Sequence, residues 1–130
     1  MIIIGHRFIP SDNIYHVTNI DAISKTPPSS CIYLEFSEEN LEIINHAVSN
    51  NVTLALAVNN LKEFIYASSL GASFIIVPKD LANDAQNIAN EYLYDAKVLV
   101  NIQNEDDIEE FALASLDGVI FSNAIIKISS

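Results

Sequence analysis

The chain has 130 residues, half of them hydrophobic, and a formal net charge of −11 from six Lys and Arg against seventeen Asp and Glu. These values predict one well-filled domain that buries roughly two thirds of its unfolded surface. They exclude two classes of partner, because the phosphates of nucleic acid and of anionic membranes would repel such a chain.

Two further features indicate where the protein works. Cys31 is the single cysteine, so neither an intramolecular disulfide nor a thiolate cluster is expected, which fits a reducing cytoplasm. The apolar start, Met1–Ile4, is too short for the core of a signal peptide, and no apolar run reaches the ~20 residues that cross a bilayer. We therefore expect an acidic cytoplasmic protein.

The first thirty residues predict an irregular region with short strands. Ile2–Ile4 and Ile14–Val17 have strand-like composition, and the turn-forming residues Pro10–Asn13 separate them. The two pieces could form a hairpin, or the first could be a parallel strand and the second a sheet edge. Thr26–Ser30 contains two prolines and predicts a loop.

Residues 31–123 predict a run of βα repeats. Strand starts near Cys31, Val52, Ser73, Lys97 and Gly118 recur every 21 to 24 residues, with a helical pattern after each of the first four. The predicted strands are Cys31–Phe36, Val52–Val58, Phe74–Val77, Lys97–Ile102 and Gly118–Phe121. Residues 124–130 predict a short tail with room for one helical turn.

The central unit, Val52–Lys79, shows the pattern most clearly. Val52–Val58 carries no charge, which is typical of a parallel strand buried on both faces. Asn59 or Asn60 can cap the helix Leu61–Leu70, and Gly71 suits a left-handed residue just past its end.

The helix that follows Asp80 is predicted to be the longest in the chain. Its inner face carries an apolar stripe that includes Ala85, Ala89, Tyr92 and Leu93.

This pattern predicts a single α/β domain over residues 1–130, with a mainly parallel sheet of five to six strands. Two architectures fit, an open doubly wound sheet or a half (β/α) barrel, and self-association could complete either. In both, ligands bind at the carboxyl ends of the strands.

Polar residues follow each predicted strand at that edge of the sheet. They are Glu35, Ser37, Asn59, Asn60, Lys79, Asp80, Asn101, Gln103, Ser122 and Asn123. Asn59, Asn101, Ser122 and Asn123 are the candidates for binding a small polar ligand. The competing interpretation is that these residues cap the helices that start beside them.

Lys79 is a candidate nucleophile, because a lysine in a dry pocket at a strand end can form a Schiff base. The alternative is a solvated lysine paired with Asp80 or Glu91. The glycines are isolated, which excludes glycine-rich dinucleotide and phosphate loops. His16 and His46 belong to no ligand cluster of recognisable spacing, so we expect no metal and no cofactor.

Two short segments resemble the glycerophosphodiester phosphodiesterases, which are (β/α) barrels. Ile2–Arg7 is similar to the opening strand of that family, which ends in His-Arg, and Ile32–Glu35 resembles its second strand, which ends in a metal-binding Glu. Residues 98–123, with Asp117-Gly118-Val119-Ile120-Phe121, resemble its closing strand–helix–strand unit. The resemblance implies that His6 and Arg7 are the acid and the phosphate contact and that Glu35 binds a divalent cation.

The sequence departs from the pattern of this family beside both segments. Phe8 replaces a glycine, and Ser37 stands where an Asp is expected two residues after Glu35. The whole chain also resembles short bacterial proteins of unknown function.

Together these features favour a small binding or protein-interaction module without strong catalytic motifs, so enzymatic activity is left open. The alternative is a reduced barrel-type hydrolase or lyase that acts on a small phosphorylated metabolite through His6, Arg7, Glu35 and Lys79. A homo-oligomer, an unidentified protein partner and a small polar ligand are all compatible with the sequence.

Overall fold

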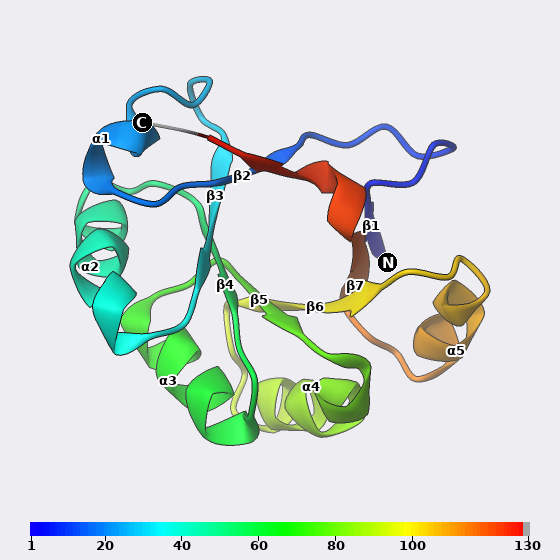
Figure 1. The fold of residues 1–130 in the computed structure, drawn as a ribbon. Helices are drawn as coiled ribbons and strands as arrows, with labels where there is room; N and C mark the ends of the chain where they lie inside the picture. Colours follow the sequence, from blue (N-terminus) through cyan, green and yellow to red (C-terminus); the bar gives the residue numbers. More distant parts are fainter. Residues whose placement is uncertain (129–130) are drawn as a thin grey trace.

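A computed structural model describes residues 1–128 of the chain. It is an α/β fold in which a parallel sheet curls into a half-barrel, with the longer helices packed on its outside (Figure 1). The strands are β1 (Ile2–Ile4), β2 (Ile14–His16), β3 (Cys31–Glu35), β4 (Leu54–Ala57), β5 (Phe74–Val77), β6 (Lys97–Ile102), β7 (Gly118–Phe121) and β8 (Ile125–Lys127). The α-helices are α1 (Ile20–Ile23), α2 (Leu41–Ser49), α3 (Leu61–Leu70), α4 (Ala82–Glu91) and α5 (Asp107–Leu113), and the 3₁₀ turns are η1 (Glu38–Asn40), η2 (Lys79–Leu81) and η3 (Ser122–Ala124).

The strand order explains why the sheet curls. It is β1-β7-β6-β5-β4-β3-β2-β8, and all of its neighbouring pairs are parallel. β7 and β8 lie toward opposite ends of this order, yet only the turn η3 joins them. Because a residue spans at most roughly 3.6 Å, this short link requires the two ends of the sheet to lie close together.

The half-barrel decides between the two predicted architectures, and the predicted strand number is wrong. Residues 1–128 contain eight strands, not five or six. The additional strands are β1 and β2, which join the sheet at the two strand-like N-terminal pieces, and β8, a strand of three residues within the predicted tail.

The N-terminal hairpin is not formed, and the predicted tail is partly a strand. β1 pairs with β7, while β2 lies between β3 and β8, so both join the parallel sheet separately. The helical turn expected after Ala124 is instead η3, which ends at that residue, followed by β8. Residues 129–130 of the predicted tail lie outside the described part of the chain.

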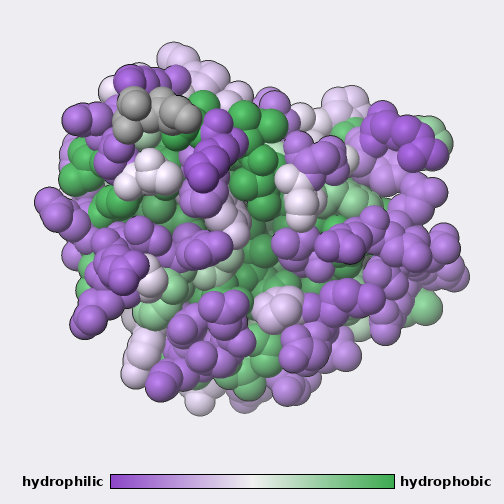
Figure 2. Space-filling view, viewed as in Figure 1, coloured by the Kyte–Doolittle hydropathy of each residue, from purple (hydrophilic) through white to green (hydrophobic). Residues whose placement is uncertain are grey.

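Alternation along the strands builds two apolar layers. One set of side chains, including Ile32, Leu54 and Ile75, packs under the helices, and the other set, including Ala55, Ile76 and Leu99, fills the inside of the half-barrel. In the face shown in Figure 2, hydrophobic residues gather toward the middle and hydrophilic residues surround them.

α3 follows from local signals that the sequence shows directly. It begins and ends at the predicted residues, and the side chain of Asn60 accepts a hydrogen bond from the Glu63 N–H at 2.9 Å. Gly71 ends it with a φ of 98°, a left-handed conformation that costs little without a Cβ. Because Asn60 caps the helix, the side chain of Asn59 remains available for another role.

The predicted inner stripe of α4 is wrong at its end. Tyr92 and Leu93 are 72% and 84% exposed. The helix ends at Glu91, and Leu93 has a left-handed backbone with a φ of 55°, so the chain turns before these side chains can reach the core.

Candidate functional site

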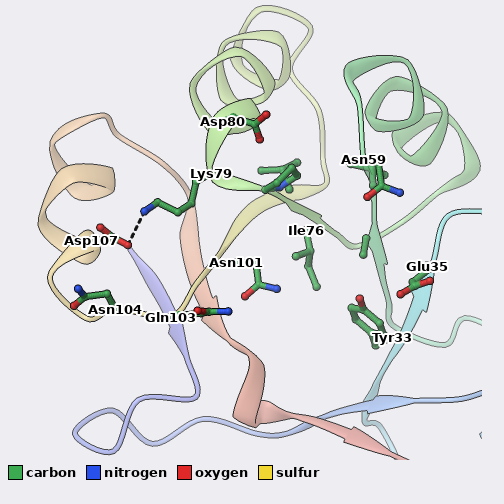
Figure 3. Close-up of a pocket in the computed structure, with 14 residues that line it drawn as sticks. Tyr33, Glu35, Asn59, Ile76, Lys79, Asp80, Asn101, Gln103, Asn104 and Asp107 are labelled. Carbon is green, nitrogen blue, oxygen red and sulfur yellow. Dashed lines mark hydrogen bonds and ion pairs between the residues drawn. The ribbon is translucent and has the colours of Figure 1, made fainter.

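A cavity of about 810 Å³ lies at the carboxyl edge of β3, β4, β5 and β6 (Figure 3). Because these strands are parallel, their ends meet at one edge and the residues after them surround one space. The polar residues that line it are Tyr33, Glu35, Asn59, Lys79, Asp80, Asn101, Gln103, Asn104 and Asp107. The volume lies within the range of small-molecule sites in proteins.

Four of the sequence-predicted candidates line this cavity together. Glu35, Asn59, Lys79 and Asn101 come from four successive strands of the sheet or the residues just after them. The side chains of Glu35, Asn59 and Gln103 form no hydrogen bond or ion pair with other residues within 1–128, so their polar atoms remain available to a ligand.

Lys79 is paired, although not with either predicted partner. Its Nζ lies 2.9 Å from Oδ2 of Asp107 at the start of α5, rather than beside Asp80 or Glu91. The hydrogen bond that Lys79 donates to Asp107 is the main cause that raises the pKa of Lys79. The negative charge of the same carboxylate raises it further. This arrangement holds the lysine as an ammonium ion, which is the opposite of what a Schiff-base nucleophile requires.

Ser122 and Asn123 lie beside this cavity and tie the end of β7 to neighbouring segments. The Ser122 hydroxyl donates to Oδ1 of Asn101 at 3.4 Å, and Asn101 itself lines the cavity. Nδ2 of Asn123 donates to the carbonyl of Gly5 at 2.9 Å. Both contacts link strand ends, and neither residue is among those that line the cavity.

His6 lies at a second, smaller cavity of about 450 Å³, which Ile3, Phe8, Ile9 and α5 also border. Arg7 does not line this cavity, but its guanidinium lies 3.7 Å from Oε2 of Glu105. The His6 side chain is 10% exposed, and its Nε2 lies 2.6 Å from Oε2 of Glu105. Its Nδ1 accepts the N–H of Phe8 at 3.1 Å, so Nε2 carries the proton that is donated to Glu105. His6 and Glu35, which the family resemblance places in one site, therefore line separate cavities.

The pairing of Glu105 predicts a pH dependence of stability. The hydrogen bond from His6 is the main cause that lowers the pKa of Glu105, and the positive charge of Arg7 lowers it further. A carboxyl with a lower pKa in the folded than in the unfolded state stabilises the fold above its unfolded pKa, and this contribution is lost as the pH falls through the folded pKa. We expect Glu105→Gln to lower the unfolding midpoint at neutral pH and to reduce its fall on acidification.

The measurement is thermal unfolding followed by circular dichroism across the acidic range. Glu91→Gln is the control, because Glu91 is exposed and forms no ion pair within residues 1–128. Parallel pH profiles for the native protein and Glu105→Gln would contradict the assignment.

Tyr33, Asp107 and Glu105 are site residues that the sequence motifs do not single out. Tyr33 stands two residues before Glu35 on β3, so strand alternation already places both on the same face. The sequence pattern favours an outer helix face for Asp107. Its contact with Lys79 spans 28 positions, so no local signal in the sequence predicts it. Glu105 pairs with His6 across 99 positions, so the sequence carries no local signal for this contact either.

Burial raises the pKa of Cys31 to about 12, which makes its thiol a poor nucleophile.

Within residues 1–128, no group of three or more His, Cys, Asp or Glu side chains is arranged to hold a metal ion. The helices of the same described part are all too short or too polar to cross a membrane.

The fold and the site together define a class of structure, a parallel α/β half-barrel with a polar cavity at the carboxyl edge of its strands. Models of known protein families give no match to the sequence, and curated proteins give none either.

Proposed function

We propose that the protein is a small binding module that holds a small polar molecule in the cavity at the carboxyl ends of β3–β6. The observation that carries the proposal is the convergence of side chains with uncommitted polar atoms, including Glu35, Asn59 and Gln103, around a volume of about 810 Å³. Amide side chains both donate and accept hydrogen bonds, which suits a ligand with hydroxyl or amide groups. The single, half-buried free thiol supports a cytoplasmic location as part of this proposal.

A thermal-shift screen tests the proposal. The panel contains neutral sugars and polyols, amino alcohols and amino sugars, and phosphorylated sugars. A ligand at a hundred times its Kd adds about 2.7 kcal/mol to the free energy of unfolding, which raises the midpoint clearly. We expect a positive shift from at least one class, and we expect Asn101→Leu to abolish it, because the substitution replaces an amide that lines the cavity with an apolar group.

The control variant is Asn83→Leu, which makes the same change on the exposed face of α4, away from the cavity. It should keep the shift. A flat panel, or an equal loss in both variants, would contradict the proposal.

A second function, a reduced hydrolase or lyase acting on a small phosphorylated metabolite, is supported by the second cavity. There a histidine donates to Glu105 at 2.6 Å, and Arg7 lies 3.7 Å from the same carboxylate. Such a pair can move a proton, and the guanidinium can contact a phosphate. The phosphorylated members of the panel test this function as well, since His6→Ala should then remove their shift while Asn101→Leu leaves it.

A further inference from the structure

The charges around the main cavity are unbalanced. The described residues that line it include three carboxylates, Glu35, Asp80 and Asp107, and one ammonium, Lys79, which leaves an excess of two negative charges. The ammonium is already held by Asp107 at 2.9 Å. Within residues 1–128, Glu35 and Asp80 form no ion pair, so their charges act on whatever enters the cavity.

The unpaired Glu35 stands next to an aromatic ring. Tyr33 and Glu35 alternate onto the same face of β3, and Figure 3 shows them together on one side of the cavity, with the Lys79–Asp107 pair on the other. The Tyr33 ring packs edge to face against His16 of the adjacent strand, with 5.0 Å between the centroids, which fixes its orientation. Burial raises the pKa of Tyr33 and the charge of Glu35 raises it further, which keeps the phenol neutral.

A carboxylate beside a neutral aromatic ring is a suitable site for an organic ammonium group. The carboxylate supplies the counter-charge and charge-assisted hydrogen bonds, and the face of the ring attracts a cation. A phosphate in the same place would meet two uncompensated negative charges, and like-charge contacts of this kind oppose binding.

We infer that the cavity selects a small organic cation that also carries hydroxyl groups, such as an amino sugar or an amino alcohol. Its ammonium group lies against Glu35 and Tyr33, and its hydroxyl groups bind the amides of Asn101 and Gln103. This inference names the ligand class for the binding function proposed above and rests on it.

Calorimetric titration with three sugars of one ring size tests the inference. The probes are glucosamine, glucose and glucose 6-phosphate, which differ in charge, at a pH below the pKa of the glucosamine amine. We expect glucosamine to bind about tenfold more tightly than glucose, as one hydrogen bond to a charged group allows. Glucose 6-phosphate should bind most weakly of the three.

Two variants that each remove one negative charge show whether Glu35 causes the preference for glucosamine over glucose. Glu35→Gln should bring the affinity for glucosamine close to that for glucose while leaving the affinity for glucose within about twofold. Glu39→Gln changes an exposed carboxylate on η1, outside the cavity, and should preserve the ratio between the two sugars.

The outcomes distinguish a failure of the cationic-ligand inference from a failure of the proposed binding function. If glucosamine and glucose bind equally and Asn101→Leu abolishes the binding of both, the inference of a cationic ligand is wrong, while the proposed binding function is supported. Tightest binding of glucose 6-phosphate would overturn the inference and support the phosphorylated substrate. If no probe binds and the broader thermal-shift panel is also flat, both the inference and the binding function are overturned.

Discussion

Phe64→Ala is expected to lower the free energy of unfolding by about 3–5 kcal/mol. Phe64 lies on α3 with none of its side chain exposed and packs in the layer between the helices and the sheet. Its ring also lies 5.7 Å from that of Tyr94, centroid to centroid. Removing it leaves a large cavity and takes a considerable share of the roughly 5–15 kcal/mol that holds a small domain together.

Urea unfolding followed by circular dichroism measures this loss. Phe8→Ala is the matched control, because Phe8 is 71% exposed and its substitution should change stability by no more than about 0.5 kcal/mol. If Phe64→Ala does not fold, Phe64→Leu should fold with a smaller loss, since it keeps most of the volume. Equal effects of the alanine substitutions at positions 64 and 8 would show that the outer layer is not packed as described.

Gly118→Ala is expected to destabilise the protein by about 1–3 kcal/mol through overpacking. Gly118 opens β7, opposite Ile2 of β1. A Cβ at this position would lie 2.6 Å from the carbonyl oxygen of Ile2 and 2.8 Å from Cδ2 of Leu99. A backbone carbonyl has no rotamer that relieves such a contact, so β1 must move away from β7.

Amide hydrogen exchange shows where that strain is released. The amides of Ile2–Ile4 should lose protection in Gly118→Ala, because β1 is an edge strand of three residues, while those of the interior strand β4 keep theirs. Unchanged protection in β1, or an equal loss throughout the sheet, would contradict the close approach of β1 and β7.

The fold is most predictable where local signals agree with one another. β5, β6, β7 and α3 have the predicted bounds, because apolar runs, a capping asparagine and a terminal glycine each mark a boundary. The sequence does not reveal β8 or the partners of β1 and β2, because a strand of three residues is defined by its neighbours rather than by its own pattern. The hairpin alternative relies on proximity in the chain, whereas β1 pairs with β7 and β2 lies between β3 and β8.

The candidate site is predictable as an edge of the sheet but not as a set of contacts. Residues at the carboxyl ends of parallel strands must meet at one edge, so the order of the strands alone predicts that Glu35, Asn59, Lys79 and Asn101 lie together. Sequence spacing does not show which edge residues pair. The Lys79–Asp107 contact depends on how α5 packs, and that contact leaves Glu35 as an unpaired charge in the cavity.

The most direct test of the central claim is a map of amide chemical shifts in the ¹⁵N-labelled protein during titration with the hit from the thermal-shift screen. We predict that the changes concentrate at the residues after β3, β4, β5 and β6, including Asn59, Lys79 and Gln103, and that they saturate with a single Kd. Changes confined to the surroundings of His6 and Glu105, or spread evenly over the surface, would contradict a ligand site in this cavity.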